Sequence, residues 1–492
     1  MNILQQMLQQ IDTNPLINAL PPRLSDTELY QALGRHPITP ENVREIPRDR
    51  RILLLDAIKE TFVPTAQTLK ITSTLQAMLY NGLQRRDPRD AANRLFIHEA
   101  AKLKGKPANK LPWWSSNATG AVLEGITGTG KSHAVDAFLQ RYQQVVTHGP
   151  NDACGWRELK QLVYLKVHMP ADGTRHGFLE GAFREIDRVL GTDYSTQYTG
   201  TRWSVEKKLV VFLFVLAMHR CGLLVIEEAQ AQNLADNEFS KLFITLFLRL
   251  LNWGVPIALL GNPLAFTRLK MFSQDADRFS DEGWFKLHPV LDPQSLDWGS
   301  RWLPALWLPT LLDEPDEEYV AFSEHPLDQT LAGFVWRRTA GFPRYVARLR
   351  REVQRRALQL GLSRVTTKLV DDVYQTSDTM QPLHERIDAF VRRDARALDG
   401  YLDIPGSTYR VLWASMAPKP KTGDSEPVSA RTSGAAEVCA PAKRRSAPRG
   451  GAQKSTRRRR GAADSADPGA VRTREMQDSL IASMRQSSPP AA

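Results

Sequence analysis

Residues 121–132 read AVLEGITGTGKS, in which an apolar run passes directly into the spacing G-x-x-x-x-G-K-S. The apolar run predicts a buried strand, and the segment that follows, His133 to Gln143, has a helical pattern. A glycine-rich turn between a strand and a helix can surround phosphate oxygens with backbone N–H groups, and the helix N-terminus adds positive potential. In such a turn Lys131 reaches the β and γ phosphates, and the hydroxyl of Ser132 ligates Mg²⁺. The sequence therefore predicts a site for ATP and Mg²⁺.

This loop supplies all the residues expected to surround the nucleotide. They are Gly125, Ile126, Thr127, Gly128, Thr129, Gly130, Lys131, Ser132 and His133. The alternative is a glycine-rich turn that binds no phosphate. The flanking strand and helix disfavour it, because they stand in the order that phosphate binding requires.

A second apolar strand, Gly222 to Ile226, ends in two adjacent carboxylates, Glu227 and Glu228. Burial of the strand places both carboxylates at its C-terminal end, beside the phosphate site. We expect Glu227 to hold Mg²⁺ through water, and Glu228 to orient or deprotonate the attacking water. The alternative is an acidic strand end that is merely solvated.

A third apolar strand, Val255 to Leu260, follows the helical segment Phe239 to Trp253 and runs into Gly261-Asn262-Pro263. A polar amide at the tip of a strand can hydrogen-bond the γ-phosphate or the attacking water, so Asn262 is the predicted sensor. An Asn-Pro pair also opens turns, and turn chemistry alone is a competing interpretation.

Two arginines complete the predicted catalytic set. The set is Lys131, Glu228, Asn262, Arg278 and Arg344. Arg278 is placed to act as a guanidinium that a ring-forming ATPase presents to the nucleotide of a neighbouring subunit, and Arg268 is the alternative. Arg344 lies in the first turn of a helix opened by Gly341 and Pro343, where a lid could bring a cation to the γ-phosphate. Either arginine could instead be an ordinary surface residue.

Composition divides the 492 residues into four predicted regions. Residues 1–110 are polar and mostly helical in pattern, and we interpret them as a partner-interaction segment. Residues 111–300 alternate short Val-, Leu- and Ile-rich runs with longer amphipathic segments, which predicts an α/β fold with a P-loop parallel sheet flanked by helices. Residues 301–416, with arginines on one side of Val335 to Leu360 and apolar residues on the other, predict a smaller helical lid domain. Residues 417–492 predict a disordered basic tail.

Most of the net charge of +11 comes from this tail, which carries 15 Lys and Arg against 7 Asp and Glu. Lys443 to Arg445 and Arg457 to Arg460 offer flexible positive charge to a phosphate backbone or to an acidic partner, or serve only to solubilise the chain.

The cysteines Cys154, Cys221 and Cys439 have no metal-ligand or disulfide spacing, so we expect reduced thiols. No export signal is recognised, and the apolar run Leu209 to Met218 is too short to span a bilayer. It predicts a buried helix instead. The expected location is cytoplasmic, without a membrane.

The order of these motifs resembles that of an AAA+ ATPase of the initiator-like branch. Within that branch the chain resembles the TnsC/TniB transposition regulators over about Gln76 to Leu349. Four segments carry the resemblance: Met78 to Pro88 (MLYNGLQRRDP), Gly125 to Ser132, Val189 to Tyr194 (VLGTDY) and Ile226 to Gln230 (IEEAQ). The chain departs from the family pattern in Glu227, where Asp is usual, and in its long basic tail.

The resemblance implies an ATPase, stimulated by DNA, that assembles as a homo-oligomeric ring or filament on duplex DNA. It also implies a partner transposase, licensed by the nucleotide state, and a target-selection protein. DNA contacts in such relatives follow the second strand, here Leu162 to Lys166, and Arg175 is the nearest match. A solvated loop charge is an equally good interpretation of Arg175.

Two other functions stay open. One is a helicase loader or replication initiator that acts on a partner helicase. The other is a nucleotide-gated adaptor that binds ATP but scarcely hydrolyses it. This hypothesis is motivated by Glu227, which stands where Asp is usual.

Overall fold

The computed structural model describes residues 3–103, 106, 118–200, 202–229, 238–318 and 324–416. The chain divides into two units, Met1–Lys419 and Pro420–Ala492, and all described residues belong to the first. The predicted tail, with its two basic runs, lies outside the described residues, as do Cys439 and Gln230.

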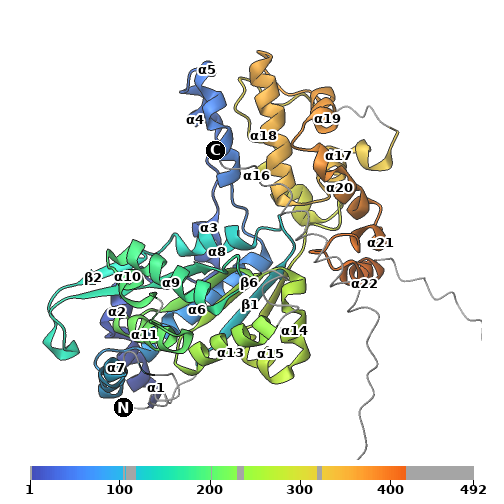
Figure 1. The fold of residues 1–492 in the computed structure, drawn as a ribbon. Coiled ribbons are helices and arrows are strands. Elements are labelled where there is room, and N and C mark those ends of the chain that lie inside the picture. The colour runs from blue at the N-terminus through green and yellow to red at the C-terminus, as the bar shows by residue number, and fades with distance from the viewer. Residues whose placement is uncertain are drawn as a thin grey trace, which may run out of the picture. The chain divides into compact units, whose positions relative to one another are not determined.

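Five parallel strands form the central sheet, in the order β4-β5-β6-β1-β7 (Figure 1). Their bounds are β1 Gly120–Gly125, β4 Tyr164–His168, β5 Leu223–Ala229, β6 Ile257–Gly261 and β7 Trp284–Leu287. Every residue of β1 and β6 is buried, as expected of parallel strands covered on both faces. The predicted α/β fold, a parallel sheet flanked by helices, is confirmed.

Side chains alternate between the two faces of this sheet, as the pleat requires. Val122 and Leu224 pack in one apolar cluster with α9, α11 and α13, whereas Leu123 and Val225 pack in another with α6 and α8. The bounds are α6 Ala66–Arg85, α8 Lys131–Leu139, α9 Arg175–Leu190, α11 Val205–Met218 and α13 Glu238–Asn252. Each face is therefore closed by its own layer of helices, and α11 confirms the predicted buried helix.

Shorter elements connect these layers. They are α7 Ala91–Lys102, η3 Asp152–Cys154, α10 Tyr194–Tyr198, η4 Pro263–Phe266, α14 Thr267–Met271 and α15 Ser273–Phe279. A separate antiparallel pair, β2 (Val145–His148) with β3 (Leu159–Leu162), was not predicted. The strand expected over Leu162 to Lys166 is in fact the end of β3 followed by β4, because the chain leaves this pair and joins the main sheet at Tyr164.

The N-terminal segment is helical, and its two parts pack in different places. Its elements are α1 Ile3–Asp12, α2 Pro15–Asn18, α3 Asp26–Leu33, α4 Pro40–Arg44, α5 Arg48–Arg51 and the 3₁₀ helix η1 Ile52–Glu60. Leu16 and Leu29 pack with α6 against the sheet. Val43 and Ile58 instead pack in a cluster with Leu311, beside α18 of the helical domain (Figure 1).

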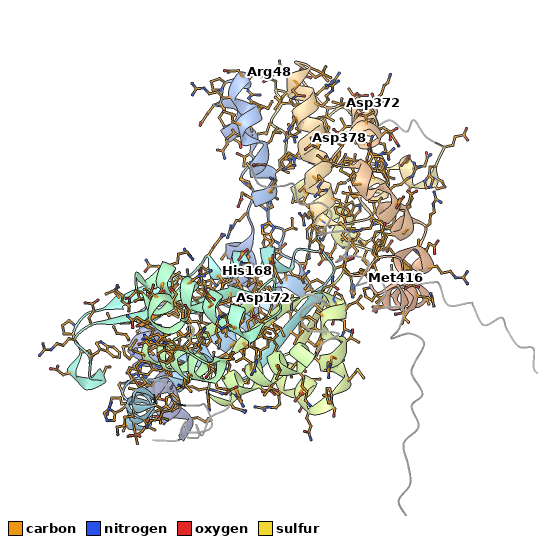
Figure 2. All side chains as sticks on the ribbon, viewed as in Figure 1. Arg48, His168, Asp172, Asp372, Asp378 and Met416 are labelled. Atoms are coloured by element: carbon orange, nitrogen blue, oxygen red, sulfur yellow. The ribbon has the colours of Figure 1, made fainter. Side chains whose placement is uncertain are left out.

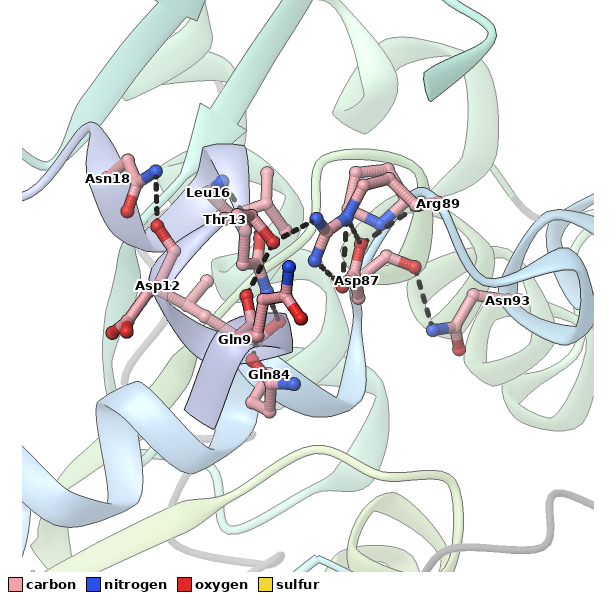
Figure 3. Close-up of polar contacts among 12 residues, drawn as sticks. Gln9, Asp12, Thr13, Leu16, Asn18, Gln84, Asp87, Arg89 and Asn93 are labelled. Atoms are coloured by element: carbon pink, nitrogen blue, oxygen red, sulfur yellow. Dashed lines mark hydrogen bonds and ion pairs between the residues drawn. The ribbon is translucent and has the colours of Figure 1, made fainter. Parts of the chain in front are cut away.

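A polar junction fixes α1 and α2 to the end of α6 (Figure 3). Arg89 donates to both carboxylate oxygens of Asp87, and its Nη1 also donates to Oγ1 of Thr13 at 2.5 Å. Asn93 Nδ2 donates to the backbone oxygen of Asp87 at 3.0 Å. Asp87 belongs to the segment Met78 to Pro88, one of the four that carry the family resemblance. At least this residue of the segment therefore has a structural role in the junction.

The chain after the sheet forms a helical domain with an apolar core of its own. Its elements are η5 Trp298–Trp302, α16 Leu303–Leu306, η6 Pro326–Gln329, α17 Leu331–Thr339, α18 Pro343–Gln359, α19 Thr367–Thr376, η7 Gln381–Leu383, α20 His384–Val391, α21 Ala395–Leu398 and α22 Gly406–Met416. The predicted helical lid is present, and the boundaries proposed from composition stay predictions. None of the helices in the described residues is long and apolar enough to cross a membrane.

The amphipathic pattern over Val335 to Leu360 covers two helices, which the sequence pattern alone did not separate. The chain turns between them at Ala340 and Gly341, with φ of 48° and 69°. A side chain at Gly341 would come within 2.2 Å of the backbone oxygen of Val290. The expectation that the arginines lie on one side, away from the apolar residues, is wrong for Arg338 and Arg350, which are both buried and paired with carboxylates.

Candidate nucleotide site

The glycine-rich loop joins β1 to α8 with the tight backbone that its spacing predicted. Gly128 and Gly130 have φ of 95° and 92°, conformations that favour glycine, and α8 begins at the next residue, Lys131. The ammonium of Lys131 donates to the backbone oxygens of Gly125 at 2.6 Å and Ile126 at 3.2 Å. Burial lowers the pKa of Lys131 to about 8, against the attraction of Glu227. A phosphate would therefore meet a partly desolvated cation.

A cleft of 1420 Å³ lies over this loop and is lined by several elements. The predicted residues that line it are Thr127, Gly128, Thr129, Gly130, Lys131, Ser132, His133, Glu228, Asn262 and Arg344. The cleft exceeds the roughly 300–1,000 Å³ usual for a small-molecule site. It thus has room for a nucleotide.

Other predicted residues do not line the cleft. They are Gly125, Ile126, Glu227, Arg278 and Arg175. Gly125 ends β1, and Ile126 is buried in the core of the helical domain, so these two support the loop from below.

The two glutamates at the end of β5 differ sharply in environment. The pairing of β5 with β6 is irregular between Ile226 and Ala229, and Glu228 has φ of 60°, uncommon for a residue with a side chain. The side chain of Glu228 is 62% exposed and that of Glu227 only 4%. The irregularity therefore turns Glu228 to the cleft and leaves Glu227 inside.

Glu227 is held by a cation from the neighbouring strand. Its Oε2 is 3.0 Å from Nζ of Lys166 on β4, and its Oε1 is buried with no hydrogen-bond partner. Nδ1 of His168, labelled in Figure 2 at the end of β4, is 3.8 Å from both Oε2 of Glu227 and Oε2 of Glu228. A role for Lys166 or His168 at this site was not predicted, because neither residue belongs to a motif.

Asn262 opens a turn, one of the two interpretations of its sequence context, and its sensor role stays a prediction. Its Oδ1 accepts from the backbone N–H of Leu264 at 3.2 Å and caps η4, so the turn role is present. The residue also lines the cleft. Since the oxygen is engaged, the amide nitrogen is the group left to donate to a ligand.

Arg344 lies against the glycine-rich loop. Its backbone N–H donates to the backbone oxygen of Gly128 at 3.4 Å, and a Cβ placed on Gly128 would lie 3.4 Å from Cβ of Arg344. Its guanidinium has no hydrogen bond or ion pair with another of the described residues. An unpaired cation at this place suits an anionic ligand.

Arg278 and Arg175 have partners away from the cleft. Arg278 donates through Nη2 to the side-chain oxygen of Asn252, which ties α15 to the end of α13. Arg175 is not in an open loop, because it begins α9 and is 3.3 Å from Glu206 of α11. Both proposed roles, in subunit and DNA contact, stay predictions.

The N-terminal segment contributes to the cleft, which sequence reasoning missed. Thr61, Phe62 and Val63 line it, and the ring of Phe62 lies 5.2 Å from the imidazole of His133 between centroids. Burial lowers the pKa of His133, so the ring is the neutral partner of an aromatic pair. No motif marks these residues, which lie more than sixty positions before the loop.

The oxygen ligands offered by Ser132 and Glu227 suit Mg²⁺ better than a metal ion that is held by protein ligands alone. No group of three or more His, Cys, Asp or Glu among the described residues could hold a metal ion. Mg²⁺ usually takes one or two protein ligands together with water and phosphate oxygens. The exposed Ser132 hydroxyl and the unpartnered Oε1 of Glu227 suit that pattern.

One comparison with known proteins bears on this part of the chain. Residues 115–269 match a family model described as an AAA domain. The fold is that of an AAA+ P-loop domain. No curated protein matches the chain. Among solved structures, a chain in the Structure of Drosophila ORC bound to DNA is 14% identical, with a TM-score of 0.30, over 70% of this chain and 81% of that one. The AAA+ match supports nucleotide binding, and the residues of the cleft indicate how it would occur.

Proposed function

We propose that this chain binds and hydrolyses ATP, and that its nucleotide state controls the assembly of several copies on duplex DNA to regulate transposition. The observation that carries the ATPase proposal is the single cleft lined by Lys131, Glu228, Asn262 and Arg344. These four side chains come from the glycine-rich loop, the end of β5, the end of β6 and the start of α18. Each supplies a different requirement of phosphoryl transfer.

Each residue has a role suited to its surroundings. Backbone N–H groups at the start of α8 and the ammonium of Lys131 hold the phosphates. Glu228, exposed at the strand end, orients or deprotonates the attacking water. The amide of Asn262 donates to that water or to the γ-phosphate, and Arg344 draws the helical domain onto the triphosphate. Mg²⁺, when bound through Ser132 and Glu227, neutralises phosphate charge.

Oligomerisation enters the proposal through Arg278. This arginine lies outside the cleft of its own chain, and in this proposal its guanidinium leaves Asn252 to reach the nucleotide of a neighbouring copy. A guanidinium supplied in trans stabilises charge that develops on the transferred phosphoryl group. This is why we expect rings or filaments.

The transposition role rests on the resemblance to the TnsC/TniB regulators. Two of its four segments, Met78 to Pro88 and Val189 to Tyr194, lie outside the nucleotide motifs. In this role the cytoplasmic protein would license a partner transposase, with a target-selection protein as a further partner. Arg175 stays the candidate DNA contact.

The test is ATP hydrolysis by the purified chain, with and without duplex DNA, alongside electron microscopy of the same samples. Lys131→Ala is the blank that removes phosphate binding, and Glu228→Gln is expected to bind ATP without turnover. DNA-stimulated hydrolysis with rings or filaments is the expected result. Turnover indifferent to DNA would refute the DNA-regulated function, and capture of a replicative helicase would favour a helicase loader.

One observation favours a second candidate, a nucleotide-gated adaptor with little hydrolysis. Glu227 is buried and paired with Lys166, so its carboxylate is already neutralised before any metal arrives. Slow phosphate release that Glu228→Gln leaves unchanged would support the adaptor. Release that disappears in this variant would exclude it.

A further inference from the structure

Lys166 on β4 places its ammonium between two carboxylates. Its Nζ is 2.5 Å from Oδ1 of Asp136 and 3.0 Å from Oε2 of Glu227. The Lys166 side chain is only 23% exposed, and the two carboxylates at these distances compensate its positive charge. Lys166 is therefore a charged group at the base of the nucleotide site.

The carboxylate of Glu227 is satisfied on one side only. Oε2 meets Lys166, whereas Oε1 is buried without a hydrogen-bond partner. Buried polar atoms seldom lack partners, and such an exception calls for an explanation, an ion included. A carboxylate with one oxygen paired and one free can receive an incoming cation at the free oxygen.

Asp136 links Lys166 to the other residue proposed to face Mg²⁺. Asp136 lies four positions after Ser132 on α8, so the two side chains share one face of the helix. Lys166 thus joins Glu227 to the helix face that carries Ser132. The Asp136 side chain is 38% exposed and can keep Lys166 paired if Glu227 is released.

We propose that Lys166 is a stand-in cation for Glu227, which pairs with Lys166 in the nucleotide-free protein and exchanges it for hydrated Mg²⁺ when nucleotide is loaded. The inference rests on the proposed nucleotide site. Lys166 is a positioning residue here: it prevents a buried carboxylate from standing unpaired, and it sets how much Mg²⁺ is needed to take its place. This also accounts for Lys166 having a second acceptor, Asp136.

The test compares Lys166→Met with Lys241→Met, which removes an exposed lysine of α13. Binding of a fluorescent ATP analogue is measured first in EDTA and then during a titration with Mg²⁺. Lys166→Met is expected to lower the half-saturating Mg²⁺ concentration roughly tenfold or more, the scale of one charge-assisted hydrogen bond. Lys241→Met is expected to match the unmodified protein.

The melting temperature in EDTA gives a second measurement that does not depend on activity. Lys166→Met leaves Glu227 buried and unpaired and should melt lower, whereas the double variant Lys166→Met with Glu227→Gln carries neither charge and should recover. An unchanged or raised Mg²⁺ midpoint, with analogue binding intact, overturns the stand-in role and leaves the nucleotide site standing. A double variant that melts no higher than the single one also counts against it. Absence of analogue binding in every condition overturns the nucleotide site itself.

Discussion

Gly82 on α6 faces Gly222, just before β5, across a contact that leaves no room for a side chain. A Cβ on Gly82 would lie 2.2 Å from the backbone oxygen of Gly222 and 2.8 Å from Cγ of Pro256. Overpacking costs about 1–3 kcal/mol or more. Because the nearest atom is backbone and cannot rotate away, the cost should lie at the upper end of this range. The better helix propensity of alanine returns about 1 kcal/mol. Gly82→Ala should therefore lower the free energy of unfolding by about 1–2 kcal/mol.

Gly181→Ala on α9 is the matched control for this prediction. Gly181 is also inside a helix, but nothing lies within 4 Å of a Cβ placed there. This variant should gain about 0.5–1 kcal/mol. Urea unfolding followed by circular dichroism of both full-length variants would measure the two changes. The reasoning is refuted if Gly82→Ala is as stable as the unmodified chain while Gly181→Ala gains stability.

Three further predictions concern the cleft and the core. Arg344→Ala should weaken ATP binding by roughly ten- to a hundredfold, because one or two charge-assisted hydrogen bonds are lost, and titration calorimetry would measure this. The melting temperature without nucleotide should stay nearly unchanged in a thermal melt. Burial lowers the pKa of His219, so the unfolded chain binds the proton at a higher pH than the folded one does. The contribution of His219 to stability is therefore complete above about pH 6.5 and is lost as the pH falls toward the lowered pKa of the folded state. His219→Asn should flatten this part of a pH series of urea melts. Asp316→Ala, which leaves the buried Arg350 without its carboxylate, should cost about 3–5 kcal/mol, and Arg350→Met should cost less in the same melts.

The sequence could predict the parts of this protein that depend on local patterns. The apolar runs and the glycine spacing around Lys131 were sufficient for β1, β5 and β6, the loop and the helix behind it, whereas β7 was not predicted. Chain order also placed Glu228 and Asn262 at the ends of strands, where parallel topology brings them to one edge, and Arg344 at the start of a helix. These three line one cleft with Lys131, and their proposed roles await the experiments above.

Features that depend on tertiary packing were beyond the sequence. Glu227 and Glu228 are adjacent residues of the same type. The irregular pairing of β5 makes the side chain of one buried and that of the other exposed. Phe62 reaches the cleft because the N-terminal segment folds back over it, which no motif records. Arg350 reads as a surface arginine, and its burial depends on Asp316, thirty-four positions earlier.

The divided N-terminal segment restricts how the helical domain can move. Residues 38–58 pack with the helical domain, while α3 and α6, on either side of them in sequence, pack with the sheet. The polypeptide therefore passes between the two bodies twice before it reaches the later connection after β7, and Arg35 and Phe62 join those two passages by backbone hydrogen bonds of 3.1 and 3.0 Å. Several connections leave a domain fewer directions in which to move than a single linker would. Any displacement of the helical domain, and of Arg344 with it, would therefore have to carry residues 38–58 along.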